Sequence, residues 1–190
     1  MSAFLKTTVG MFSICIVLFS LISCDAVLGF GSTKRVLFIG NSYLAISNIP
    51  GVFKELAKSG GHTIEIGTAA DKGGSFAAYA HSVGVKQAMQ SSKWDYVVLQ
   101  EQSQIPSIPH LRTSKMYPGA RELVRQIRAL GATPVFLQSS GNRNGWPENS
   151  LFGYENMQLA IIQGYSEIAD ELKVPVAPVG HAWYVTMKEI

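Results

Sequence analysis

The chain has only two cysteines among its 190 residues, Cys15 and Cys24, and both lie near the amino terminus. From Asp25 onward there is no thiol. This excludes a disulfide, a thiolate nucleophile and a cysteine-ligated metal in that part of the chain. Any chemistry performed there must come from hydroxyl, amide, carboxyl or imidazole side chains.

Charged residues are also sparse, at 15% of the chain, and the formal net charge is only +3. The lysines and arginines are spread along the sequence rather than gathered in one run, so the sequence predicts no nucleic-acid partner. The hydrophobic content of 47% excludes a disordered chain and is typical of a single globular domain.

Signals for metals and cofactors are missing as well. Histidine, aspartate and glutamate do not cluster with the spacing of metal ligands, and no G-x-x-x-x-G-K-[ST] phosphate loop occurs. We therefore expect neither a metal site nor a cofactor.

The amino-terminal segment has the pattern of a secretory signal. Lys6 precedes an uncharged, largely apolar run from Val9 to Ile22, which is shorter than the roughly 20 residues of a membrane-spanning helix. Its "LISC" ending resembles a bacterial lipobox, which implies cleavage before Cys24 and diacylation of its thiol. We expect residues 1–23 to be a lipoprotein signal peptide, residues 24–33 a short linker and residues 34–190 one domain.

The expected location follows from this signal. The mature protein would be exported and anchored in a membrane through Cys24, on the periplasmic or cell-surface side. The alternatives are an ordinary signal peptide cut somewhere before Thr33, which would give a secreted protein, or a retained anchor.

The rest of the chain alternates short apolar runs with amphipathic segments. Such alternation predicts an α/β fold, a three-layer α/β/α sandwich around a five-stranded parallel, flavodoxin-like sheet. The expected strands are Arg35–Gly40, His62–Ala70, Trp94–Gln100, Ala132–Gln138 and Val174–Gly180. The expected helices are Ile49–Ser59, Ser75–Gln90, Lys115–Leu130 and a long one ending at Leu172.

The segments that leave the first four strands contain "GNSY", "ADKGGS", "QEQSQIP" and "QSSGNRNGWPE". In an open parallel sheet these segments meet at one edge, where ligands bind. Ser42 lies at the sharp turn after the first strand, where a hydroxyl can attack an acyl carbon while nearby N–H groups hold the oxyanion. The alternative is that Asn41 and Ser42 only cap the next helix.

Several of these motifs resemble the SGNH (GDSL-like) hydrolases. "VLFIGNSY" is similar to the first block of that family, with Gly-Asn-Ser in place of the commoner Gly-Asp-Ser, and "GGSF" is similar to the second. "WDYVVLQEQSQIP", "NGWPEN" and "VPVAPVGHAW" resemble an uncharacterised SGNH-like branch. The resemblance extends from Lys34 to Trp183.

The resemblance assigns roles to individual residues. It implies that Ser42 is the nucleophile and that its N–H, the N–H of Gly74 and the side chain of Gln102 form the oxyanion hole. Gly73, the preceding residue, is the alternative candidate for the backbone donor assigned to Gly74. A second glutamine, Gln100, lies two residues from Gln102. The sequence around these two glutamines departs from the Gly-x-Asn-Asp motif of the family.

The family's Asp-x-x-His block, which supplies the catalytic base, does not occur in this sequence. Two histidines are candidates for that role: His181, directly after the fifth expected strand, and His110, in the proline-containing loop. We expect a chain that is truncated before the Asp-x-x-His block.

Together these features predict a serine esterase or acyl hydrolase, acting on small-molecule or carbohydrate esters. The alternative is a catalytically inactive or ligand-binding protein of the same fold, since serine without a base is a poor nucleophile. A flavodoxin-like nucleotide or flavin binder would use the same edge, but it would need more Ser, Thr and Gly than "GNSYLAI" offers.

Overall fold

The computed structural model describes residues 32–70 and 73–188. The chain divides into two units at the Ser32–Thr33 boundary, and the fold below is that of the second unit. The expected signal peptide and Cys24 lie outside the described residues.

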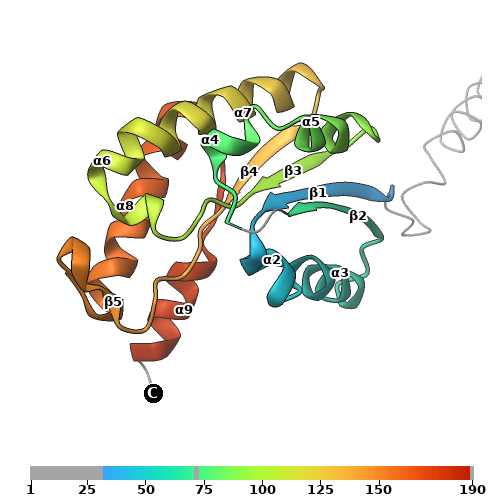
Figure 1. Ribbon diagram of the computed structural model, residues 1–190. Coiled ribbons are helices and arrows are strands. Elements are labelled where there is room, and N and C mark those ends of the chain that lie inside the picture. The colour runs from blue at the N-terminus through green and yellow to red at the C-terminus, as the bar shows by residue number, and fades with distance from the viewer. Residues whose placement is uncertain (1–31, 71–72, 189–190) are drawn as a thin grey trace, which may run out of the picture. The chain divides into compact units, whose positions relative to one another are not determined.

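A five-stranded, all-parallel sheet forms the centre of this unit, in the order β2-β1-β3-β4-β7 (Figure 1). The prediction of an α/β fold with a flavodoxin-like sheet is confirmed. The strand order reverses beside β1, which is the position where open α/β sheets bind ligands. The strands are β1 (Lys34–Gly40), β2 (Ile64–Ala70), β3 (Tyr96–Leu99), β4 (Thr133–Leu137) and β7 (Val176–Ala177).

Four helices cover one face of the sheet, and we call them the thick layer. They are α4 (Phe76–Tyr79), α5 (Val83–Gln90), α7 (Tyr117–Ala129) and α8 (Gly153–Leu172). Their apolar sides bury a large core against β1, β3 and β4. At its centre the Phe136 ring stacks on Phe76, with centroids 5.8 Å apart, and meets Tyr165 edge-on at 6.2 Å.

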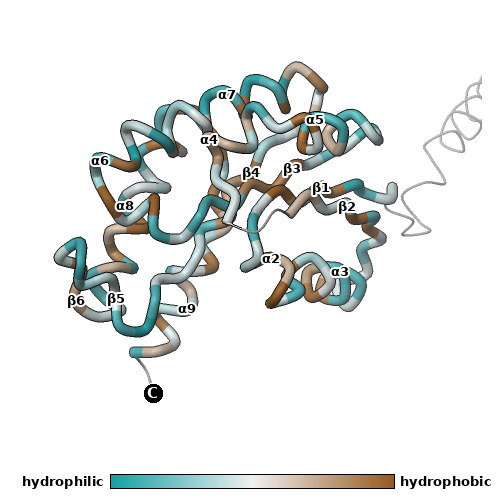
Figure 2. Tube along the Cα trace, in the orientation of Figure 1, coloured by the Kyte–Doolittle hydropathy of each residue, from teal (hydrophilic) through white to brown (hydrophobic). Residues whose placement is uncertain are grey.

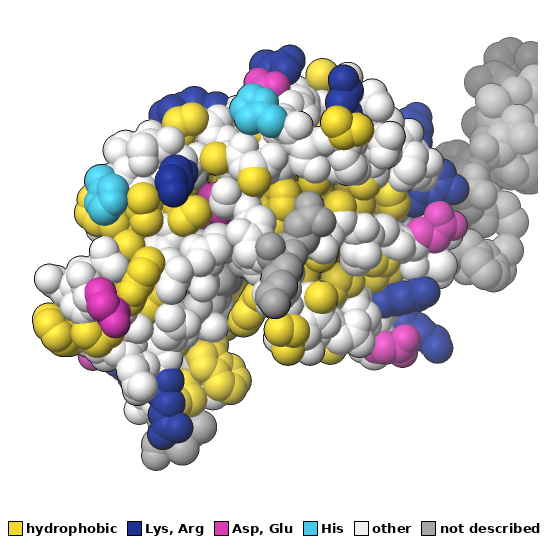
Figure 3. Space-filling model, in the orientation of Figure 1, with side chains coloured by type: hydrophobic (Ala, Val, Ile, Leu, Met, Phe, Trp, Pro, Cys, Tyr) yellow, Lys and Arg dark blue, Asp and Glu magenta, His cyan; other side chains and the backbone are white. Residues whose placement is uncertain are grey.

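The opposite face is covered more sparsely by α2 (Ser42–Ile46) and α3 (Ile49–Ser59), which we call the thin layer. Its core is a small cluster around Phe38, whose ring meets Phe53 at 5.7 Å. Pro50 is the only buried residue of α3, and Leu56 is 68% exposed. Figure 3 shows hydrophobic side chains at the surface between the thick layer and α3.

The structure differs from the sequence-based expectation at several places. The single helix expected over residues 75–90 is two helices, because the Ser82 side chain accepts a hydrogen bond from Val85 N (3.3 Å) and starts α5 anew. The fifth strand is only two residues long, and the unpredicted helix α9 (Val179–Lys188) follows it. The polar loop after β4 contains a small hairpin of β5 (Gly145–Trp146) and β6 (Leu151–Phe152).

Short helical turns complete the connections. They are η2 (Ile105–Ser107), α6 (Pro109–Leu111), the π-type turn η3 (Arg112–Met116) and η4 (Pro147–Asn149). As expected from the sequence, α7 is followed by Gly131 in a left-handed conformation, with φ +78°.

The ring of Trp94, a residue just before β3, packs between β2 and α5. The indole N–H of Trp94 donates to the Ala88 carbonyl oxygen at 2.9 Å. A Cβ at Gly67 would lie 2.4 Å from the Trp94 ring, so the ring fits only because β2 has a glycine at this position.

Apolar residues concentrate in the central strands, and hydrophilic ones on the outer surface of the helices (Figure 2). Within residues 32–70 and 73–188, no helix combines the length and hydrophobicity needed to cross a bilayer.

Candidate functional site

Ser42 begins helix α2 directly after β1. Asn41, not Ser42, caps this helix: its backbone is extended and its side-chain oxygen accepts a hydrogen bond from Tyr43 N at 3.0 Å. Among the described residues, no partner forms a hydrogen bond with the Ser42 hydroxyl. The capping role considered for "NS" thus falls to Asn41, and the turn does not use the hydroxyl of Ser42, a half-buried residue.

Two contacts fix this turn against the neighbouring strand ends. The backbone N–H of Asn41 donates to Gln100 Oε1, at the end of β3, at 3.2 Å. The hydroxyls of Tyr43 and Ser140 lie 3.3 Å apart, which ties α2 to the segment after β4. The ends of β1, β3 and β4 are therefore linked around Ser42.

The turn before α4 requires glycine at two successive positions. Gly73 has φ +73°, in the left-handed region that favours glycine. A Cβ at Gly74 would lie 2.3 Å from the hydroxyl oxygen of Tyr79, whose side chain is buried. The backbone N–H assigned to the oxyanion hole thus lies in a turn where side chains are excluded by conformation and by contact.

Glu101, to which sequence reasoning assigned no catalytic role, is fully buried two residues after the end of β3. Both carboxyl oxygens accept from Phe76 N at 3.1 Å, and Oε1 also accepts from Gln102 N at 2.7 Å. Its own N–H donates to the Tyr165 hydroxyl at 3.0 Å. Burial raises the pKa of Glu101 to about 7, against the opposing effects of these N–H groups and of the Lys115 charge.

The two glutamines near this point have local partners. Gln102 Oε1 accepts from Gln104 N at 3.0 Å and from Ile105 N at 3.2 Å, and its Nε2 donates to Gln104 Oε1 at 2.7 Å. The Gln102 amide thus holds the start of η2 in place. The second hydrogen of its Nε2 is left for another acceptor. Gln100 is fully buried and donates to the Glu101 carbonyl oxygen. The role of Gln102 in the oxyanion hole stays a prediction.

The two candidate histidines are both exposed. His181 lies near the start of α9, where its backbone N–H donates to Gln138 Oε1 at 2.9 Å and its ring lies 6.3 Å from that of Tyr184. His110 lies on α6. Neither imidazole makes a hydrogen bond or ion pair with another described residue, so no carboxylate in this part of the chain orients either ring.

A cavity of about 530 Å³ opens beside the segment after β4. Gly141, which follows Ser140 in the chain, lines it, and its wall is mostly apolar although three of the lining residues are charged. Tyr154, which lines it, has a buried hydroxyl with no hydrogen-bond partner among the described residues. The other lining residues are Arg143, Glu155, Trp183, Tyr184, Met187 and Lys188.

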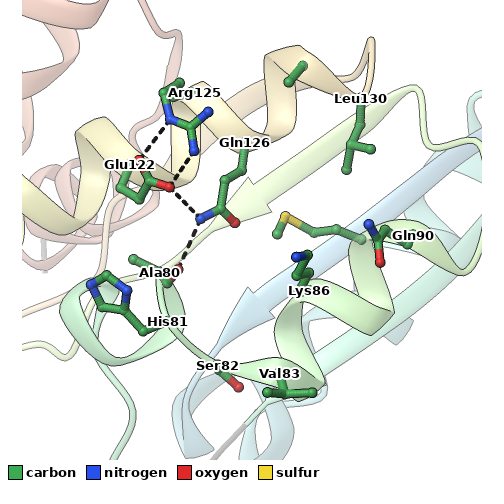
Figure 4. A pocket seen from close by; sticks show the side chains of 12 residues that line it. Ala80, His81, Ser82, Val83, Lys86, Gln90, Glu122, Arg125, Gln126 and Leu130 are labelled. Atoms are coloured by element: carbon green, nitrogen blue, oxygen red, sulfur yellow. Dashed lines mark hydrogen bonds and ion pairs between the residues drawn. The ribbon is translucent and has the colours of Figure 1, made fainter.

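A second cavity, of about 510 Å³, lies between α5 and α7 and contains none of the expected site residues (Figure 4). Its wall mixes apolar and polar side chains, and on the polar side Gln126 Nε2 donates to the Ala80 carbonyl oxygen at 3.0 Å and to Glu122 at 2.7 Å. Gln90, at the end of α5, and Leu130, just after α7, line it, and these helix ends lead to the amino ends of β3 and β4, so the cavity extends toward the edge opposite Ser42. Within the described residues, no group of three or more potential ligands is arranged to hold a metal ion.

No protein-family model and no curated protein matches the sequence, but solved structures match the fold. A DUF4886 family protein from Bacteroides uniformis is similar with a TM-score of 0.64 and 20% identity, over 78% of this chain and 68% of that one. The SGNH-hydrolase family esterase AlinE4 gives 0.53 and 14%, over 78% and 77%. The acetyl xylan esterase AlAXEase gives 0.56 and 14%, over 75% of each chain. These likenesses show the SGNH hydrolase fold.

Proposed function

We propose that this protein, which has the SGNH hydrolase fold, is a serine esterase or acyl hydrolase with Ser42 as its nucleophile. The observation that carries the proposal is the turn after β1. Asn41 caps α2, the Asn41 N–H is held by Gln100, and the Ser42 hydroxyl is left without a partner among the described residues at the carboxyl edge of the sheet.

The proposed reaction has two steps. The Ser42 oxygen bonds to the acyl carbon, its proton passes to a base, and the alcohol leaves with a proton to give an acyl-enzyme. Water then attacks the acyl carbon, releases the acid and restores the hydroxyl. The N–H groups of Ser42 and Gly74 and the amide of Gln102 would stabilise the oxyanion in both steps. His181 and His110 remain the candidate bases.

The proposed substrates are small or carbohydrate-borne esters. Support comes from the cavity of about 530 Å³ beside Ser140, whose aromatic wall suits an acyl group or the face of a sugar ring. One similar solved structure is an acetyl xylan esterase. No nucleic acid, metal or cofactor enters this proposal.

We also propose that the protein is exported and anchored through a diacylated Cys24. The support is the "LISC" ending of the uncharged, apolar amino-terminal run. Mass spectrometry of the mature amino terminus tests this directly. A diacylglyceryl adduct on Cys24 is expected, and a mature protein that starts at any other residue would rule the anchor out.

The esterase proposal is tested with p-nitrophenyl acetate and with a fluorophosphonate, which forms a covalent adduct with activated serines. Ser42→Ala should reduce turnover to the uncatalysed background and abolish the adduct, because the attacking oxygen is lost. Ser47→Ala is the matched control, since Ser47 is an exposed serine at the end of the same helix. Equal turnover in wild type and Ser42→Ala would contradict catalysis and favour a ligand-binding protein.

A further inference from the structure

Glu101 is the one carboxylate with a fully buried side chain among the described residues, and it has no ion-pair partner there. Burying a carboxyl group costs free energy unless hydrogen bonds replace its hydration, and an apolar side chain would avoid that cost. The groups that this carboxyl group holds therefore indicate a role beyond packing.

The hydrogen bonds of Glu101 join parts of the chain that are distant in sequence. Its oxygens accept from Phe76 N, at the start of α4, and Glu101 itself lies two residues after the end of β3. Its backbone N–H donates to Tyr165 on α8, which steadies the end of β3 from the thick layer. The carboxyl group thus fixes the first N–H of α4 to the end of a central strand.

The residue that follows β3 also contacts the turn that carries Ser42. Gln100 N donates to the Ile39 carbonyl oxygen at 2.9 Å, and Gln100 Oε1 accepts from Asn41 N. The chain of contacts therefore runs from the residue before Ser42, through Gln100 and Glu101, to Phe76, two residues after Gly74.

We propose that Glu101 is a positioning residue that holds the Gly73–Gly74 turn, and with it the oxyanion-hole N–H of Gly74, in place relative to Ser42. The inference rests on the proposed esterase function. It adds a residue to which no catalytic role has been assigned. Glu101 touches neither the acyl carbon nor the oxyanion in this role and acts only through the turn.

The test compares two substitutions of Glu101 that differ in one property. Glu101→Gln keeps an oxygen that can accept from both Phe76 N and Gln102 N, whereas Glu101→Ala removes every acceptor. Gln158→Ala is the matched control, because Gln158 is equally buried but holds Gly141 N, at 2.8 Å, in a different segment.

Two readouts are needed, amide hydrogen exchange followed by NMR and steady-state kinetics with p-nitrophenyl acetate. In Glu101→Ala, exchange at Phe76 N should rise about tenfold or more, and kcat should fall by up to about 100-fold with KM nearly unchanged, as expected when a catalytic group is displaced by about 1 Å. Glu101→Gln should restore both. Gln158→Ala should speed exchange at Gly141 and leave Phe76 protected.

Other outcomes would overturn the inference. Unchanged exchange at Phe76 in Glu101→Ala would show that the carboxyl group does not hold the turn. A kcat as low in Glu101→Gln as in Glu101→Ala, with Phe76 still protected, would show that the ionisable group itself takes part in the reaction. If wild type neither turns over substrate nor reacts with the fluorophosphonate, the esterase proposal fails, and hydrogen exchange alone then decides whether Glu101 holds the turn.

Discussion

The two layers of helices differ in how firmly they hold the sheet. The thick layer buries long apolar sides of α7 and α8 in a continuous core, whereas α3 in the thin layer buries Pro50 alone and leaves Leu56 mostly exposed. The candidate site takes one part from each: Ser42 begins α2 of the thin layer, and the Gly74 turn leads into α4 of the thick layer. Because local stability follows buried contacts, we expect the thin layer to open at a lower free energy than the thick one.

The largest expected effect tests this contrast in packing. Phe136→Ala would remove a fully buried ring between Phe76 and Tyr165 and should lower the free energy of unfolding by about 3–5 kcal/mol. Leu56→Ala in the thin layer should change it by less than about 0.5 kcal/mol, because that side chain is already in water. Urea denaturation measures both, and comparable losses would contradict the contrast.

A second effect comes from the buried carboxyl group on the thick side. The pKa of Glu101 in the folded protein is about 7, above the 4.5 of a glutamate in water, so the folded state holds the proton more tightly. Its contribution to stability is therefore fully present below about pH 4.5 and is lost as pH rises through about 7, a total of about 3 kcal/mol.

Glu101→Gln isolates this contribution, since exposed carboxylates such as Glu171, whose pKa is lowered chiefly by its hydrogen bond with Arg121, titrate in both proteins. The difference in unfolding free energy between the variant and wild type should shift in favour of the variant by about 3 kcal/mol between pH 4.5 and pH 8. Chemical denaturation at a series of pH values measures the difference. A constant value would show that Glu101 does not titrate in this range.

The smallest expected effect concerns a single methyl group. Gly74→Ala would place its Cβ 2.3 Å from the Tyr79 hydroxyl and should cost about 1–3 kcal/mol as the buried ring is displaced. Gly84→Ala is the control: its Cβ would meet only Ser82 Oγ, at 3.8 Å, in an exposed turn of α5, so it should be neutral or stabilising by up to about 1 kcal/mol. Thermal unfolding separates the two, and equal shifts would mean that the Gly74 turn has room to relax.

The sheet could be predicted because its signals are local. Runs such as "RVLFIG" and "WDYVVLQ" are continuous apolar segments bounded by turn residues, and their alternation with amphipathic helices permits few topologies. The same reasoning placed Ser42 at the carboxyl edge, since the turn after β1 is itself a local feature.

The parts that could not be predicted depend on contacts between distant residues. Nothing in "LQEQS" indicates that Glu101 would bond to Phe76, because the two are 25 positions apart and the partner is a backbone N–H. The break at Ser82 was signalled by a capping residue, but the apolar spacing of the flanking residues masked it. Helix α9 was missed because its apolar residues follow a strand without a polar loop between them.

The wedge that Trp94 forms against Gly67 also makes this ring an optical probe. Its indole is half-buried and hydrogen-bonded, whereas Trp183 is 56% exposed, so the two should emit at different wavelengths. Replacing Trp183 and Trp146 by phenylalanine would leave Trp94 as the single tryptophan, which reports on the contact of β2, the start of β3 and α5. Its emission would then record loosening of the sheet independently of any event at the carboxyl edge, where Ser42 lies.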